Sequence, residues 1–375
     1  MDVKEIIAPT VQDWETLEEF SDSLQDKAAV ISECMAQLKK TPGDQEVAEL
    51  VLRSLHNIKG DASLTKLALG VAIAHHSESL FQRFKAGEFL FSDVFSETIL
   101  LSLDRLELAV DNLLHRATLE NLQLMTLLQE MEKAIAAPPD KVIALCGKLI
   151  EAVTGFPPVS IAQVDESALL EPARPAESLR HDTQDVATDL QFFRSFAMQL
   201  ESRSPFFKGR TNRILRLVLE TNKAADSPVD PVQLEAAIYM HDVGMMMMPE
   251  RTWLKMGHLS EEERLMLRGH PAYGAGLLQR MPGWEEAAIM VAQHHEMPNG
   301  SGYPLGIKDD GICEGAKLIA IVDAFEAVML KHSHRGKNRS VLRAIAEVNA
   351  CDYQFAPNWT LLFNQIIRRT VGVAA

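Results

Sequence analysis

The C-terminal half of the chain contains histidine and aspartate residues with the chemistry of metal ligands. They lie in four short segments, "HDVG", "RGHPAYG", "QHHEMPNGSGYP" and "AIVDAFEAV". The donors in these segments are His241, Asp242, His270, His294, His295 and Asp323. Four imidazoles and two carboxylates are donor types that suit iron, manganese or zinc. An adjacent His-Asp pair would let the carboxylate bridge two ions about 3.5–4 Å apart, an arrangement that could activate water and hold a phosphodiester.

The N-terminal half contains a second set of residues, which is suited to phosphoryl transfer. The segment "LHNIKGDASL" places His56 and Lys59 three residues apart, on one face of a helix. In "HHSESLF", Glu78 follows His75 at the same spacing and could accept a hydrogen bond from His56, which would make the other ring nitrogen a better nucleophile. Lys59 could neutralise an incoming phosphoryl group. The alternative is that His56 is an ordinary surface histidine and that Gly60 is a helix defect.

Helices are expected to position the N-terminal set. Residues 1–135 are predicted to form an antiparallel helical bundle, because apolar residues in "LLSLDRLELAVDNLL" recur at intervals of three and four residues, which gives a helix one apolar face. Thr41 or Asp44 is available as an N-cap after the break "KTPGDQE", and Ser92 can cap a later helix.

A linker and a second helical domain are expected to follow. Residues 136–184 are rich in Pro, Ser, Ala and Glu, which predicts a linker with one short helix around "VIALCGKLIEAV". Residues 185–375 return to helical patterning and contain the metal donors. The whole chain is therefore predicted to be all-α.

The composition argues against several functional classes. The formal charge is −15 and no long basic run occurs, so we expect no polynucleotide binding, which needs a Lys/Arg-rich surface. No run of about 18 apolar residues occurs, which predicts that nothing spans a membrane. The four scattered cysteines show no CxxC spacing, and the N-terminus lacks the apolar core of a signal peptide. These features predict a cytoplasmic protein.

The segment from His56 through "LGVAIAHHSESLFQRFKAGE" resembles the histidine phosphotransfer (HPt) domain of chemotaxis-type histidine kinases. That family has a His-x-x-Lys-Gly helix that receives the phosphoryl group and a His-x-x-Glu on the next helix. The matching residues are His56, Lys59, His75 and Glu78. The resemblance covers about residues 10–130. It implies a relay between an upstream histidine kinase and the aspartate of a response-regulator receiver domain, which brings its own Mg²⁺.

The metal-competent segments resemble, in order and spacing, the HD-GYP subgroup of the HD phosphohydrolase superfamily. The segment "GSGYP" supplies the signature residues Gly302, Tyr303 and Pro304. The resemblance spans about residues 185–345. It implies an all-helical domain that binds divalent transition-metal ions through the six donors and hydrolyses cyclic di-GMP. It also implies contact between the GYP loop and diguanylate cyclase domains, and homodimerisation.

Several positions depart from the HD-GYP pattern. The family has a lysine after His-Asp-x-Gly, where this chain has Met245. Methionine cannot stabilise charge, and losing one such donor typically costs about 10²–10³ in rate. The following residues, Met246–Met248, are expected to fill core gaps. The family has an Arg-Pro-Tyr-Arg segment where this chain has "HSHR" at 332–335, so only Arg335 is retained. Arg335 is expected to contact phosphate.

The other departure is at Arg210, which stands where the family has a histidine ligand, while Thr211 and Arg213 are retained. Arginine stays protonated and does not ligate metal. One metal position would then keep only His241, Asp242 and Asp323, and the other would keep the complete set Asp242, His270, His294 and His295. Arg210 could repel the first ion or hold a ligand phosphate in its place, with Arg213 nearby.

Three functional hypotheses follow. The first is a cyclic di-GMP phosphodiesterase, slowed by Met245 and Arg210 and controlled by phosphorylation of His56. The second is a catalytically degenerate adaptor that binds ligand or partner proteins without turnover. The third, an HD-type phosphohydrolase acting on other nucleotides, is disfavoured by the GYP loop.

Overall fold

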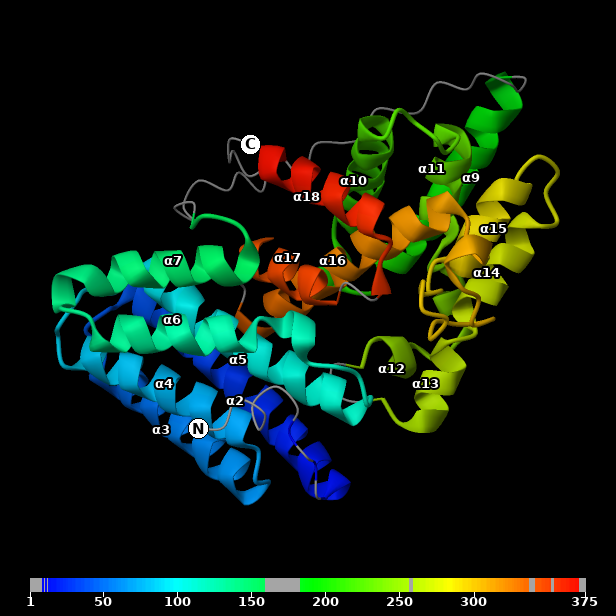
Figure 1. Ribbon diagram of the computed structural model, residues 1–375. Helices are drawn as coiled ribbons and strands as arrows, with labels where there is room; N and C mark the ends of the chain where they lie inside the picture. Colours follow the sequence, from blue (N-terminus) through cyan, green and yellow to red (C-terminus); the bar gives the residue numbers. More distant parts are fainter. Residues whose placement is uncertain are drawn as a thin grey trace. The chain divides into compact units, whose positions relative to one another are not determined.

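The structure is a computed structural model in which all regular elements of the described residues are helices (Figure 1), which confirms the predicted all-α class. The described residues are 9, 11, 13–158, 183–255, 259–336, 341–351 and 354–370, with the side chains of 183–184 and 331–336 left aside. They divide into two compact units, with boundaries after Gln163, Ala327 and Cys351. The segment 328–351 groups with the first unit.

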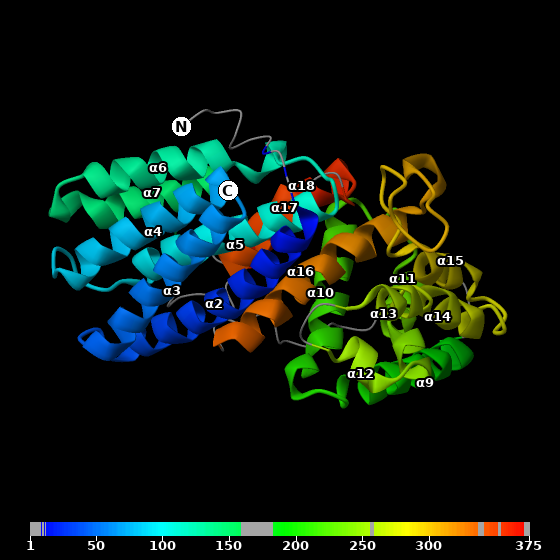
Figure 2. The same cartoon turned by 90° about the horizontal axis from the view of Figure 1, so that it is seen from below.

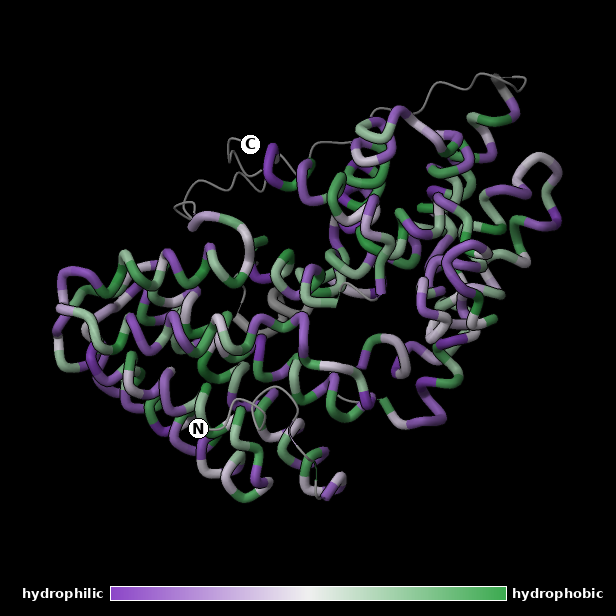
Figure 3. Tube along the Cα trace, viewed as in Figure 1, coloured by the Kyte–Doolittle hydropathy of each residue, from purple (hydrophilic) through white to green (hydrophobic). Residues whose placement is uncertain are grey.

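The first unit is a bundle of long helices that lie side by side in two views (Figures 1 and 2). Its helices are α2 (Trp14–Lys40), α3 (Gln45–Leu64), α4 (Ala68–Lys85), α5 (Asp93–Leu114), α6 (Leu124–Ala136), α7 (Val142–Thr154) and α17 (Val341–Ala350). Hydrophobic and hydrophilic residues alternate along these helices (Figure 3). Asp44 caps α3 by accepting from the amide of Val47 at 3.1 Å, and Ser92 caps α5 by accepting from Phe95 at 3.2 Å. Both caps agree with the sequence prediction.

The structure differs from the predicted domain boundaries. The segment 136–184 was expected to be a linker with one short helix; that helix is α7, and it packs against α5 and α6. The reason is its apolar face, on which Val142, Leu149 and Ile150 are buried. The segment 185–375 was expected to be one domain, yet α17 packs against α5 and α7. Residues 159–182 of the expected linker lie outside the described residues.

The second unit contains the candidate metal ligands. Its elements are α9 (Thr183–Glu201), η4 (Pro205–Phe207), α10 (Arg210–Ala224), α11 (Pro231–Met240), η5 (Val243–Met247), α12 (Glu250–Trp253), α13 (Glu261–Leu267), α14 (His270–Leu278), α15 (Glu285–Gln293), η6 (Asp309–Gly311), α16 (Glu314–Gly336) up to Ala327, and α18 (Pro357–Thr370). Helix α11 contacts α9, α10, α14 and α15, so it lies at the centre of the unit. In the described part of the chain, no helix is both long and apolar enough to cross a membrane.

Candidate metal centre

The His-Asp pair lies at the buried end of α11. Asp230 caps the start of this helix by accepting from the amides of Val232 and Gln233, and Pro231 occupies its first position. Most residues of α11 are buried around the whole circumference, which is typical of a helix in the middle of a core. The chain leaves the helix inside this core, so His241 and Asp242 are each only 4% exposed.

The other donors reach the same place from three further helices. His270 begins α14, His294 and His295 directly follow α15, and Asp323 lies within α16. The donor atoms form two groups, each with all its atoms within 4.8 Å of one another. The three-donor group is His241, Asp242 and Asp323, and the four-donor group is Asp242, His270, His294 and His295. The structure therefore brings all six predicted donors together, with Asp242 shared by both groups.

Three of the histidines are oriented by the same local hydrogen bond. Nδ1 of His241, His270 and His294 each donates at 2.7 Å to the carbonyl oxygen three residues earlier. Because a carbonyl only accepts, Nδ1 must hold the proton in the neutral ring. In the neutral rings, the Nε2 lone pairs are then left for a ligand, and a hydrogen bond from the other ring nitrogen to a carbonyl is usual for metal-binding histidines.

Unsatisfied acceptors in this cluster fit a bound cation. Nε2 of His270 lies 3.3 Å from Nε2 of His294 and 3.4 Å from Oδ1 of Asp242. All three are acceptors when the imidazoles are neutral, so their mutual approach needs a positive charge between them. Asp242 Oδ1 is buried and has no hydrogen-bond partner among the described residues. The donor set and these orphaned atoms fit a divalent metal ion.

The electrostatics of the site differ between the two donor groups. Burial lowers the pKa of the His294 and His295 imidazoles, that of His295 to about 4, so both are neutral at pH 7. Burial alone would raise the pKa of the Asp242 carboxyl, but the charges of His241 and Arg210 hold that pKa well below its usual range. Burial alone would lower the pKa of His241, but the carboxylates of Asp242 and Asp323 raise it to about 10.

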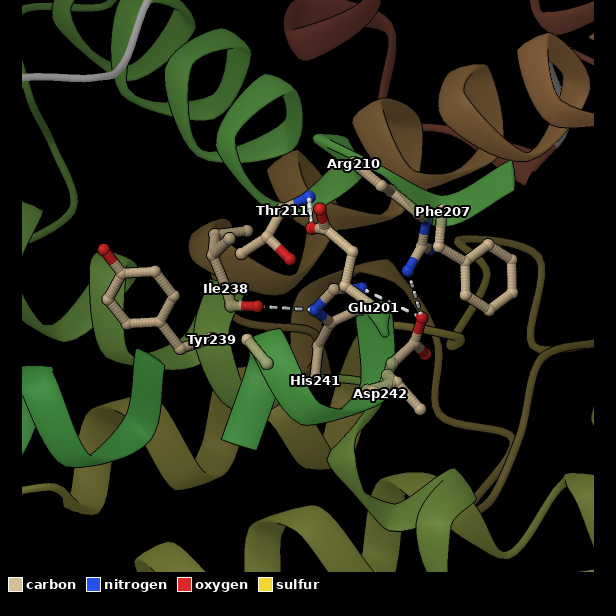
Figure 4. A pocket seen from close by; sticks show the side chains of 10 residues that line it. Glu201, Phe207, Arg210, Thr211, Ile238, Tyr239, His241 and Asp242 are labelled. Carbon is tan, nitrogen blue, oxygen red and sulfur yellow. Dashed lines mark hydrogen bonds and ion pairs between the residues drawn. The ribbon is translucent and has the colours of Figure 1, made fainter. Parts of the chain in front are cut away.

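Arg210 reaches into the three-donor group, and Figure 4 shows its guanidinium beside Asp242. Its Nη1 donates to Oδ2 of Asp242 at 2.7 Å, and its Nη2 donates to Oδ1 of Asp323. The side chain is the first of α10, whose N-terminus is capped by Glu201, which accepts from the amides of Gly209 and Thr211. The guanidinium is therefore a component of the centre and is paired with the same carboxylates that a metal would use.

The guanidinium of Arg213 is paired away from the metal-donor cluster. Its guanidinium is buried and donates three hydrogen bonds to Glu326 and one to the carbonyl oxygen of Lys208. This pairing fixes α10 against α16, so the expected ligand-binding role is replaced by a structural one. The sequence did not reveal Glu326 as the partner. The side chain of Arg335 lies outside the described residues.

The GYP loop closes over the four-donor group. Tyr303 stacks on the ring of His295, with centroids 4.7 Å apart and planes at 25°, and its amide donates to the His295 carbonyl at 3.1 Å. An added Cβ at Gly302 would lie 2.4–2.5 Å from the backbone of residues 295–297, so only glycine permits this approach. Glu296, a residue that the sequence prediction omitted, is buried and holds the loop by accepting from the amides of Leu305 and Ile307. Pro304 follows in the same loop.

The methionines after the His-Asp pair differ in their surroundings. Met248 is buried, Met245 and Met246 are half-buried, and Met247 is 54% exposed. The expectation that Met246–Met248 fill core gaps is therefore met by Met248 alone. Met245 leaves the centre without the charged donor that the family pattern has there.

In the first unit, three of the four predicted phosphotransfer residues meet. Glu78 accepts from Nδ1 of His56 at 3.2 Å and from the ammonium of Lys59. The His56 side chain is 68% exposed, so its Nε2 faces solvent. His75 is also exposed, its ring lies beside His76, and within the described chain it shows no bond to the other three.

Comparison with known proteins identifies the class of the C-terminal half of the chain. Residues 194–354 match the family model described as HD domain. This segment contains all six donors and Arg210. The C-terminal half of the chain therefore contains an HD domain.

Individual relatives match over about a third of the chain. A 3'3'-cGAMP-specific phosphodiesterase 3 of Vibrio cholerae is 28% identical over 142 residues, 38% of this chain and 31% of that protein. The cyclic di-GMP phosphodiesterase response regulator RpfG of Xanthomonas campestris is 30% identical over 125 residues, 33% and 32% of the two chains. A cyclic di-GMP phosphodiesterase of Thermotoga maritima is 32% identical over 111 residues, 29% and 30%. The matched segment spans about a third of the length of these relatives.

One solved structure, the HDG"Y"P protein Bd1817 of Bdellovibrio bacteriovorus, aligns over 80% of this chain and 72% of its own. The identity is 11% and the TM-score 0.36, so this likeness supports no conclusion.

Proposed function

We propose that the HD domain recognises cyclic di-GMP at a divalent iron, manganese or zinc centre and hydrolyses it slowly. The observation that supports this most is the convergence of His241, Asp242, Asp323 and the three further histidines, with imidazole Nε2 atoms aimed at one another. The names of the relatives, all phosphodiesterases of cyclic dinucleotides, support the substrate class.

The protein groups around the centre suggest how a dinucleotide would be held. A bound divalent ion supplies Lewis-acid stabilisation of the charge that develops on a phosphodiester. The cavity beside Arg210 has only about 20 Å³, room for a single water, so the substrate does not enter there. Near the four-donor group, Arg268 is exposed and lies 5.6 Å from the centroid of the Tyr303 ring. Arg268 offers a cation for a phosphate, next to Tyr303 and His295.

Turnover by the purified chain tests this proposal. The chain is loaded with Mn²⁺ or Fe²⁺ and incubated with cyclic di-GMP or 3'3'-cGAMP, and the products are separated by chromatography. We expect linear products that disappear in His294→Ala, and a rate that rises about 100-fold in Met245→Lys because a charged donor is restored. Binding without any turnover would favour the degenerate adaptor. Neither binding nor turnover of either dinucleotide would refute the proposal.

A second function is proposed for the first unit, in which His56 accepts a phosphoryl group from a receiver domain. The observation that favours it is the exposed His56 ring, whose Nδ1 is held by Glu78 and whose Nε2 is open to solvent. Lys59 lies on the same face, and Gly60 has no atom within 4 Å of an added Cβ, so the surface is open to a partner.

Label transfer tests the relay. The chain is mixed with a receiver domain that has been phosphorylated with labelled phosphate in the presence of Mg²⁺. We expect label on the chain that is stable to base and labile to acid, and no label in His56→Gln. His115→Gln, which alters another exposed histidine of the same unit, is the control and should accept label normally. Label that persists in His56→Gln would rule out the assignment.

A further inference from the structure

We infer that Arg210 is a built-in cation that closes the three-donor group, so that the centre binds a single metal ion in the four-donor group. This inference deepens the proposed function. It rests on the part of that proposal that concerns metal binding, and is independent of whether the substrate is turned over.

The guanidinium already uses the oxygens that would complete a site with His241. Oδ2 of Asp242 and Oδ1 of Asp323 lie 3.3 and 3.6 Å from Nε2 of His241. These same two oxygens accept from Nη1 and Nη2 of Arg210. A guanidinium remains charged in proteins, so a metal ion at this position would be repelled at close range and would compete for the same lone pairs.

Arg210 is held in this position from several sides. Its backbone starts α10, and the amides on either side of it, those of Gly209 and Thr211, donate to the Glu201 carboxylate. Its guanidinium lies 5.9 Å from the centroid of the Phe207 ring. The adjoining cavity of about 20 Å³ is too small to receive a displaced guanidinium (Figure 4). An entering ion would therefore have to leave a buried, unpaired charge behind.

The opposite side of Asp242 is open to a cation. Oδ1 faces His270 and His294, at 3.4 and 4.0 Å from their Nε2 atoms, and has no hydrogen-bond partner within the described ranges. Asp242 thus divides its two oxygens between a fixed guanidinium and the four-donor group. Three imidazoles and one carboxylate oxygen make a four-ligand set of the kind that zinc, manganese and iron accept.

Metal stoichiometry tests this inference without reference to activity. The full chain is stripped with chelator, saturated with Mn²⁺ and desalted, and bound metal is measured by mass spectrometry, with electron paramagnetic resonance to detect coupled ion pairs. We expect one uncoupled Mn²⁺ per chain. In Arg210→His we expect two ions per chain and a coupled spectrum. Arg216→His, the same change farther along α10 where the side chain pairs with Glu220, should stay at one.

A pair of ligand variants decides the question if Arg210→His does not fold. His241→Gln should keep one ion, because His241 belongs to the group closed by Arg210, whereas His270→Gln should keep none. Two ions in the unaltered chain, loss of the ion in His241→Gln, or a folded Arg210→His that still binds one ion would each overturn the inference. One bound ion without hydrolysis of cyclic di-GMP would leave the inference intact and defeat only the proposed turnover.

Discussion

Replacing Gly244 with alanine is expected to break the metal centre through a backbone collision. An added Cβ at Gly244 would lie 2.1 Å from the carbonyl oxygen of His270 and 2.9 Å from its carbonyl carbon. Ordinary contact begins near 3.4 Å, so η5 and the start of α14 would have to separate by about 1.3 Å. We expect a loss of about 3 kcal/mol in unfolding free energy, the upper end for overpacking, because no side-chain rotation relieves a backbone contact.

The same displacement should weaken metal binding, because metal–ligand distances tolerate only about 0.2 Å of error. We expect the Mn²⁺ affinity, measured by isothermal titration calorimetry, to fall by about 100-fold or more. Gly276→Ala in α14 is the matched control, because an added Cβ there meets nothing within 4 Å. It should bind metal normally and gain about 0.5–1 kcal/mol in urea denaturation. Equal stability and equal affinity in the two variants would refute this reasoning.

Three further outcomes are expected. Gly302→Ala should push the GYP loop off His295 and lower Mn²⁺ affinity about tenfold in the same calorimetric assay; unchanged affinity would contradict the close approach. Arg343→Met should cost about 3 kcal/mol in urea denaturation, because it removes two hydrogen bonds, of 2.5 and 2.6 Å, to the buried carboxylate of Asp104; a change under about 0.5 kcal/mol would show the pair to be dispensable. Burial tends to raise the pKa of Glu78, but its hydrogen-bond donors outweigh this and hold the pKa below 4.5. The ionised Glu78 carboxylate therefore stabilises the fold above about pH 4.5, and this stabilisation is lost as the pH falls through the lower folded-state pKa. The urea midpoint should therefore fall less between about pH 5 and 3 in Glu78→Gln, which lacks the carboxylate, than in the unaltered chain.

Local features of the structure were predictable from the sequence. The helical class follows from apolar periodicity, and Asp44 and Ser92 cap helices where short polar residues precede periodic segments. The six donors could be chosen by residue type and by the order of short motifs. The orientation of three of the histidines depends on hydrogen bonds to a carbonyl oxygen only three residues earlier, such as that from His270 to Leu267. A helical turn places such a carbonyl within reach, so no distant partner is needed.

Long-range pairings explain what the sequence did not predict. The boundaries near residues 135 and 185 missed the packing of α7 and α17 on the bundle, because an amphipathic helix does not reveal which surface will cover its apolar face. Arg343 and Asp104 are 239 residues apart in the chain. A charged residue in the apolar α17 was the available signal that a buried partner exists.

Two residues near the centre show the same limit. Arg213 was expected to contact ligand, yet Glu326, 113 residues away, takes its guanidinium. Glu296 was overlooked although it directly follows two candidate metal ligands, His294 and His295. A carboxylate at that position beside a glycine-rich loop was a signal for a group that holds the loop by its amides.

The position of a bound metal tests the central claim most directly. Crystals of the Mn²⁺-loaded chain, recorded at the manganese absorption edge, should show one anomalous peak per chain, at about 2.0–2.3 Å from Asp242 Oδ1 and from imidazole nitrogens of His270, His294 and His295. No peak within bonding distance of these four side chains, or six donor side chains that point away from one another, would contradict it.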